Sequence, residues 1–92
     1  MNIEFDPEKD NTNQKKHGIS LAMAAFLDWE AALIEADNRF DYGELRFIAL
    51  SPLDSRIYTV VFTYRKPNIR VISLRKSNKK EVQRYVHHNE RR

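Results

Sequence analysis

The chain has 92 residues, enough for one domain around a single hydrophobic core, and we expect residues 1–92 to form that domain. The absence of cysteine excludes disulfides and thiolate metal ligands and is typical of a reducing cytoplasm. The first ten residues are polar and acidic, unlike a signal peptide, and the longest apolar run, residues 21–27, is too short to cross a membrane. We therefore expect a soluble cytoplasmic protein.

The net charge of +3 conceals an asymmetry between the two halves of the chain. Residues 1–55 carry 5 Lys/Arg and 11 Asp/Glu, whereas residues 56–92 carry 11 Lys/Arg and 2 Asp/Glu. A basic block of this size can bind a polyanion or pair with the acidic half across the fold. It can also serve solubility alone, as in many small basic domains.

The first segment predicts a short strand followed by a helix. Ile3 and Phe5 alternate with polar neighbours, which is typical of a strand at the edge of a sheet. Asp6 is a suitable N-cap and Pro7 a suitable first residue for the helix that follows. Gly18 suits the residue just after its end.

A second helix is predicted over residues 21–27, which are rich in alanine and leucine and can be capped by Ser20. Two short helices joined by a glycine are typical of an αα-hairpin. Residues 31–36 fit either a short strand or a helical extension, and the sequence does not decide between them. Residues 37–43 are polar and turn-rich, so we expect a loop.

Three strands are predicted in the second half, and they form an antiparallel meander. They cover residues 45–50, 57–64 and 69–75. The turns between them are Ser51-Pro52-Leu53-Asp54 and Lys66-Pro67-Asn68. Strict alternation predicts that four side chains share one face of the last strand: Ile69, Val71, Ser73 and Arg75.

The chain ends with a predicted helix from Asn78, which forms a variant of the capping box with Glu81. Val82, Tyr85 and Val86 make an apolar stripe that can dock on the sheet. The element order therefore predicts an α+β domain with an antiparallel meander, an N-terminal αα-hairpin and a C-terminal helix packed on the sheet.

Four cations gather where the last strand meets this helix. Lys79 and Lys80 occupy the first turn, where the helix dipole disfavours positive charge, and Arg75 and Lys76 precede it. Cations beside exposed backbone N–H groups suit a phosphate oxyanion, so we expect Lys76, Lys79 and Lys80 to bind RNA. The alternative is that these side chains simply extend into water.

Arginines and aromatic residues are interleaved on the last two strands. Arg65 follows the central strand and Arg70 lies on the next, so a hairpin brings both near the same sheet surface. Tyr58, Phe62 and Tyr64 share one parity of the central strand. Flat rings and guanidinium planes suit unpaired bases, although such rings more often belong to the core, which we favour for Phe62.

His17 stands beside Lys16 at a helix end, where imidazole can exchange protons near neutrality or simply supply a helix-end charge. His87 and His88 are consecutive on a helix and point apart, so they do not form a metal site. The chain has no glycine-rich phosphate loop and no Ser/His/Asp pattern. We expect neither a metal nor a cofactor.

Several motifs together resemble the BrnT family of toxins, in the family's order and over nearly the whole chain. They are Phe5-Asp6-x-x-Lys9, Asn13-x-x-Lys16-His17-Gly18-Ile19-Ser20, Gly43-Glu44-x-Arg46, Val60-Val61-Phe62-Thr63-x-Arg65 and Ile69-Arg70-Val71-Ile72-Ser73-x-Arg75-Lys76, followed by Glu81 and Tyr85. Leu74 and Ser77 replace the usual small alanines, and Ser51 with Pro52 replaces the usual Ile-Gly at a strand end.

The resemblance implies a RelE-like fold and a type II toxin that cleaves RNA and thereby inhibits translation. It also implies an antitoxin partner similar to the BrnA proteins, which dimerise through a ribbon-helix-helix module. Toxin and antitoxin would form a heterotetramer that represses its own operon. Matching positions give the candidates for the active surface: Lys16, His17, Glu44, Arg65, Arg75 and Tyr85.

Our hypothesis for the reaction is metal-free cleavage by the RNA 2′-OH. Arg65 and Arg75 would hold the phosphate, Glu44 or His17 would act as base, and Lys16, His17 or Tyr85 would return a proton. The rival is a non-catalytic module that binds RNA or a partner on the same fold. A DNA-binding regulator is weaker, because no basic recognition helix is evident.

Overall fold

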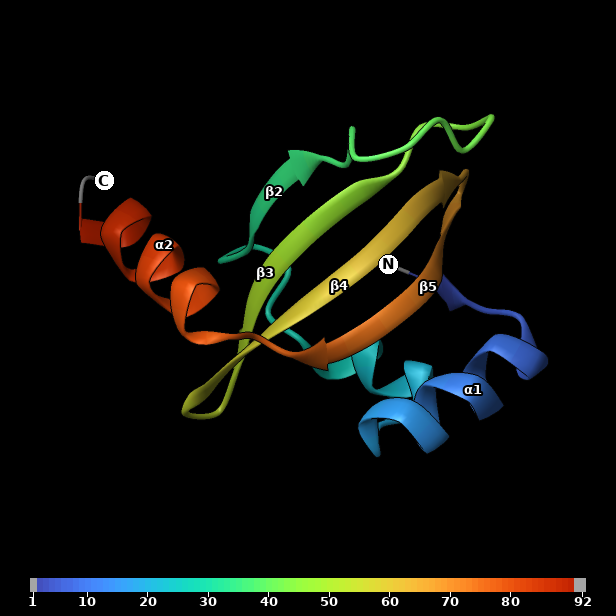
Figure 1. The fold of residues 1–92 in the computed structure, drawn as a ribbon, viewed down its shortest axis with the longest axis horizontal. Coiled ribbons are helices and arrows are strands. Elements are labelled where there is room, and N and C mark those ends of the chain that lie inside the picture. The colour runs from blue at the N-terminus through green and yellow to red at the C-terminus, as the bar shows by residue number, and fades with distance from the viewer. Residues whose placement is uncertain (1, 91–92) are drawn as a thin grey trace.

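The computed structural model describes residues 2–90, and Figure 1 shows a curved sheet with helices at two opposite ends. The elements in this range are β1 (Ile3–Glu4), α1 (Pro7–His17), the 3₁₀ helix η1 (Leu21–Phe26), β2 (Leu33–Ala36), β3 (Phe47–Leu53), β4 (Arg56–Arg65), β5 (Asn68–Lys76) and α2 (Lys79–Glu90). The α+β class is therefore confirmed, and residues 37–46 form the long loop between β2 and β3.

The five strands form one mixed sheet in the order β1-β5-β4-β3-β2. Strands β2 to β5 are the expected antiparallel meander, and β1 is an edge strand as predicted, but it runs parallel to β5. The sequence left residues 31–36 open between a strand and a helical extension, and in the structure residues 33–36 form a strand. The predicted turn at residues 51–54 was too long. Asp54 has a left-handed backbone that makes a tighter hairpin, so β3 stays paired with β4 as far as Leu53.

The prediction of an αα-hairpin was wrong in its second member, which is a 3₁₀ helix. Its buried side chains are Leu21 and Ala24, followed by Leu27 just after its end. This spacing of three matches the three residues per turn of a 3₁₀ helix, so one narrow ridge faces the sheet. The side chain of Ser20 caps the helix by accepting from the Ala22 amide, as the sequence indicates.

The ridge of η1 packs on one face of the sheet and forms the hydrophobic core with it. Val60, Phe62 and Val71 lie at the centre of this core and are buried. Trp29 makes a T-shaped contact with Phe62, with ring centroids 5.2 Å apart, and its Nε1–H donates to the Ala24 carbonyl. Phe62 is thus a core residue, as we favoured.

A β-bulge in β5 overturns the expected distribution of its side chains. Val61 pairs with Ser73 while Phe62 pairs with Val71, so Ile72 is an extra residue. The bulge switches the parity: Ser73 and Arg75 lie on the face opposite the core, the same face as Arg70. The prediction that Ser73 and Arg75 share a face with Ile69 and Val71 was therefore wrong.

Helix α2 lies at the β2–β3 end of the sheet, far from α1, and touches the sheet near β3 (Figure 1). Asn78 and Glu81 make the predicted reciprocal capping bonds of 2.8 and 2.9 Å. Of the predicted apolar stripe, Tyr85 is buried, Val82 is half-buried and Val86 remains 46% exposed. The helix therefore docks by its first turns rather than along its length. Within residues 2–90 no helix has the length and apolarity to span a bilayer.

Candidate functional site

Most of the candidate residues fall into two groups at opposite ends of the central strands. Arg75, Lys16 and His17 form the Arg75 group, and Arg65 and Glu44 form the Arg65 group. Arg75 pairs with Thr59 near the start of β4, whereas Arg65 is the last residue of β4. Arg65 is six residue steps along the extended strand from Thr59, which corresponds to about 20 Å. Both arginines are also held by different carboxylates. One phosphate group cannot be gripped by both, so we treat the two groups as separate sites.

Arg75 is held by a two-point ion pair with Glu81. Its Nη1 and Nη2 donate to the carboxylate at 2.7 and 2.9 Å, and the Glu81 side chain is only 15% exposed. Nη1 also donates to the Lys76 carbonyl. Among the described residues, no protein group accepts from the Arg75 Nε–H. The Nε–Nη2 edge of the guanidinium is therefore oriented and free to bind an anion.

Glu81 also caps α2, because its carboxylate accepts from the Asn78 amide. Burial raises the pKa of Glu81, but the hydrogen bonds from Arg75 and the Asn78 amide outweigh burial and leave it below its ordinary value. The anion that we expected at this helix end is thus partly replaced by the chain's own carboxylate. Lys76, Lys79 and Lys80 nevertheless remain exposed around it.

Lys16 and His17 form the last turn of α1, which Gly18 closes in a left-handed conformation at φ 71°. With Lys9, Ile72 and Ser73 they line an open pocket of about 250 Å³. Burial lowers the pKa of His17 below the ordinary 6.5, and the charges of Lys16 and Arg75 lower it further. The imidazole is therefore mostly neutral at pH 7 and can accept a proton.

Asn13 places this end of α1, a role that the sequence did not reveal. It is the buried residue of an otherwise polar helix, and its side chain donates to the Leu74 carbonyl and accepts from the Leu74 amide at 2.8 and 3.1 Å. It also donates to the Ile19 carbonyl. Because β1 pairs with β5 at Ile3 and Glu4, the edge of β5 at Leu74 has no strand neighbour, and Asn13 takes that place.

The second group surrounds Arg65 at the other end of β4. Its Nη2 donates to Glu44 at 3.3 Å, and Glu44 also accepts from Arg46 at 3.1 Å. The Arg46 hydrogen bond lowers the pKa of Glu44, partly opposed by burial and aided by the charges of both arginines. The guanidinium of Arg46 lies 4.1 Å over the ring of Tyr42.

Asp37 anchors the loop that carries Glu44. Its carboxylate accepts two bonds from Arg39, at 2.8 and 2.9 Å, and one from the Tyr42 hydroxyl. The Arg39 hydrogen bonds outweigh burial and lower the pKa of Asp37 to about 2. Its amide donates to the Arg46 carbonyl at 2.8 Å. The sequence indicated only a polar loop here, because nothing local shows that Asp37 is buried.

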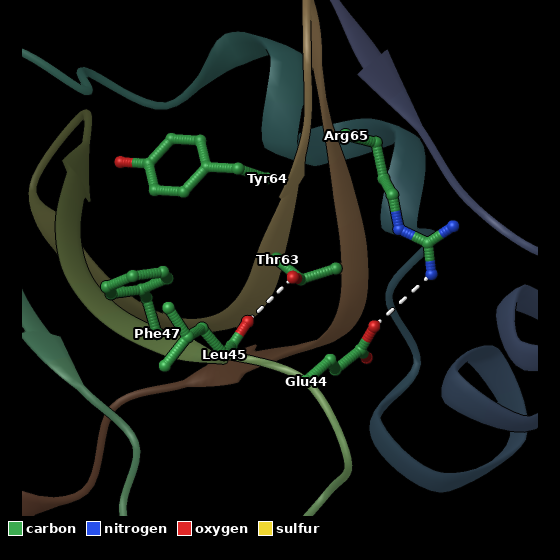
Figure 2. A pocket seen from close by; sticks show the side chains of 6 residues that line it. All are labelled: Glu44, Leu45, Phe47, Thr63, Tyr64 and Arg65. Atoms are coloured by element: carbon green, nitrogen blue, oxygen red, sulfur yellow. Dashed lines mark hydrogen bonds and ion pairs between the residues drawn. The ribbon is translucent and has the colours of Figure 1, made fainter.

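A pocket of about 300 Å³ lies beside this second group (Figure 2). The rings of Tyr64 and Phe47 stand on one side of it, and the Arg65–Glu44 pair stands on the other. Leu45 and Thr63 line it between them, and the Thr63 hydroxyl donates to the Leu45 carbonyl at 2.7 Å. Its wall is therefore mainly apolar, with charge at one rim.

The remaining candidates lie outside both groups. The Tyr85 ring is buried on α2, and its hydroxyl donates to the Ala31 carbonyl at 2.7 Å, at the β2 side of the sheet. Arg70 pairs with Glu4 at 3.0 Å on the same face as Arg75. In the range 2–90 no cluster of three or more His, Asp or Glu side chains could hold a metal ion.

Comparison with known families gives one finding that bears on this arrangement. The model of a family described as the ribonuclease toxin, BrnT, of type II toxin–antitoxin systems matches residues 5–81. The match includes both arginine groups and the end of α1. A search of curated proteins found no match to the chain.

Proposed function

Since the chain belongs to the BrnT family of ribonuclease toxins of type II toxin–antitoxin systems, we propose that it cleaves RNA without a metal at the Arg75 group. One observation carries this assignment. The end of α1 and the bulged strand β5 line one open pocket with a neutral imidazole and an ammonium group, and the oriented guanidinium of Arg75 is near enough for its charge to lower the pKa of that imidazole. These are the groups that phosphodiester cleavage by a 2′-OH needs.

Arg75 binds the scissile phosphate through its free Nε–Nη2 edge. As the 2′-oxygen attacks phosphorus, negative charge grows on the equatorial oxygens, and a guanidinium already held in place by Glu81 stabilises it without reorganising. Glu81 is a positioning residue, because it touches Arg75 rather than the RNA.

His17 takes the proton from the 2′-OH, and Lys16 returns one to the departing 5′-oxygen. The lowered pKa of His17 keeps it in the accepting form, whereas an exposed ammonium beside it carries a proton to donate. The bond to the 5′-oxygen breaks as the 2′-oxygen bonds to phosphorus, which leaves a 2′,3′-cyclic phosphate and a 5′-OH. Glu44 and Tyr85 take no part at this centre, since Glu44 lies with Arg65 and the Tyr85 hydroxyl is engaged elsewhere.

Arg65 contacts the RNA chain away from the cut. Arg70 lies between Arg65 and Arg75 on the face of the sheet opposite the core. Three exposed lysines lie near the start of α2: Lys76, Lys79 and Lys80. Such contacts add affinity that decreases steeply with salt, because they release counterions from the phosphates.

The protein antitoxin implied by the family is, in our proposal, a BrnA-like ribbon-helix-helix protein. Toxin and antitoxin would form a heterotetramer that binds operator DNA through the antitoxin and represses the operon. In its absence the toxin would cut RNA in the cytoplasm and inhibit translation. Size-exclusion chromatography with light scattering on the co-expressed pair tests the stoichiometry.

The direct test incubates the purified, partner-free protein with total RNA, with and without EDTA, beside Arg75→Ala and a DNA control. We expect fragments with 2′,3′-cyclic phosphate ends, insensitive to EDTA, and no cutting of DNA, which lacks the 2′-OH. The rate should decrease as pH falls through the lowered pKa of His17, because the protonated imidazole cannot accept a proton. Intact RNA bound by a folded protein would contradict the proposal and favour a binding module.

A further inference from the structure

The pocket beside Arg65 lies at the end of β4 and is not used by the cleavage chemistry, although it is an open pocket with a mainly apolar wall. We propose that it binds one unpaired nucleobase of the RNA, with Arg65 on the neighbouring phosphate. This inference rests on the proposed function for its ligand, but it concerns recognition rather than catalysis. In this proposal the pocket determines at which position along the RNA the cut is made.

The wall of the pocket offers a fixed aromatic face. The Tyr64 ring makes T-shaped contacts with Phe47 and Phe62, with centroids 5.1 and 5.4 Å away and interplanar angles of 67° and 84°. It is nevertheless 49% exposed. A ring whose orientation is set by two perpendicular neighbours and whose own surface is half open suits stacking by a flat base.

The other aromatic residues that the sequence placed with arginines do not offer this face. Phe62 is 1% exposed and lies in the core, Tyr58 is partly buried against the core, and Tyr85 is a buried residue of α2. Phe26 is 72% exposed, but it lies on η1 and does not line the pocket. Among the aromatic residues of β4, burial thus selects Tyr64.

The charged rim of the pocket can exchange its partner. Arg65 makes one bond of 3.3 Å to Glu44, and their side chains are 48% and 30% exposed. An ion pair this exposed contributes little to stability, so a phosphate can replace the carboxylate at small cost. Glu44 keeps its shorter bond to Arg46 when Arg65 turns away.

The volume and position of the pocket agree with a base a few nucleotides from the cut. About 300 Å³ is at the lower end of the range for ligand pockets and suits a single base rather than a helix face. The separation of about 20 Å between the two arginine groups is too long for adjacent phosphates. A base held here therefore fixes the register of the RNA relative to Arg75.

The test measures binding rather than cleavage, so that it does not depend on the proposed function being correct. The full chain is titrated with single-stranded 2′-O-methyl oligoribonucleotides, which cannot be cut, and with the same strands carrying one abasic nucleotide at each position in turn. We expect one position at which removal of the base weakens binding about tenfold.

Tyr64→Leu should weaken binding of the intact strand about tenfold and abolish the penalty at that abasic position. Tyr64→Phe keeps the ring and should restore both, whereas Phe26→Leu, a matched loss of an exposed ring elsewhere, should change neither. Thermal melts verify that each variant is folded. An unchanged abasic penalty in Tyr64→Leu would overturn the inference, as would a variant that loses binding to a protein antitoxin but not to RNA.

A failure of the proposed function leaves a different pattern. In that case Arg75→Ala has no effect on cleavage, or no cleavage occurs, while the abasic penalty and its dependence on Tyr64 persist. If the inference is wrong and the proposed function is correct, RNA is still cut in an Arg75-dependent manner, and Tyr64→Leu binds the oligoribonucleotides as tightly as the parent protein.

Discussion

The two arginine groups have the same ingredients, an arginine near the end of a central strand and a glutamate partner, but they are built differently. Arg75 is held at two points by a carboxylate that is largely buried and also caps a helix. Arg65 has a single, longer bond to a carboxylate on an exposed loop. The first arrangement fixes a side chain in one orientation, whereas the second leaves it free to move.

This difference indicates a division of labour. Stabilising a transition state requires a charge that is already in place, because reorganisation costs free energy at the moment of reaction. Holding a flexible RNA chain requires only a charge within reach, since the chain adapts to it. We therefore assign chemistry to the Arg75 group and binding to the Arg65 group.

The largest expected effect is on the rate of cleavage. Arg75→Ala should lower it about 1,000-fold, because it removes the oriented donor pair, whereas Arg65→Ala should lower it only about tenfold. Single-turnover assays at saturating protein measure both, and Arg75→Lys, which keeps the charge but loses the planar fork, should lie between. Equal losses for the two alanine variants would contradict the division of labour.

The next effect concerns how α1 is placed beside Arg75. Asn13→Ala removes three hydrogen bonds, two of them to the Leu74 backbone, and should lower the free energy of unfolding by about 3 kcal/mol. Urea denaturation measures this. Gln14→Ala, which loses one exposed bond to Asp10, is the control and should cost less than about 0.5 kcal/mol. A loss below about 1 kcal/mol for Asn13→Ala would show that α1 is held by other contacts.

The loop that carries Glu44, the partner of Arg65, is anchored by Asp37. The contribution of Asp37 to the stability of the protein should be lost in acid. The folded pKa of about 2 lies below the ordinary 3.8, so this contribution is present above pH 3.8 and is lost as pH falls toward 2. Asp37→Asn should cost about 2 kcal/mol at neutral pH and progressively less in acid. Melting temperatures between pH 6 and pH 2 measure the difference. Asp54→Asn, an exposed control, should show no such convergence.

The smallest effect shows whether Tyr85 of α2 stabilises the fold or takes part in cleavage. Tyr85→Phe removes the bond to the Ala31 carbonyl and should cost about 1 kcal/mol of stability. Cleavage at a temperature where the variant is fully folded should match that of the parent protein. A rate loss of more than tenfold under those conditions would return Tyr85 to the reaction centre.

The sequence predicted much of the sheet but little of the site's geometry. The capping pairs at Asp6 and Asn78 and the three long strands are local patterns, and the structure has them. The site required contacts that no local pattern shows. Arg65 and Arg75 look equivalent in the sequence, and only the strand register separates them by about 20 Å.

Local periodicity and capping therefore determined which segments became strands and helices, because these depend on neighbours within a few residues. The tertiary structure decided which face Arg75 occupies, since one bulged residue at Ile72 reverses the parity of the strand. It also decided where Lys16 and His17 lie, through a bond from Asn13 to Leu74 across 61 residues of chain. Hydrogen bonds between residues so distant in sequence exist only once the sheet has formed, and they place the candidate site.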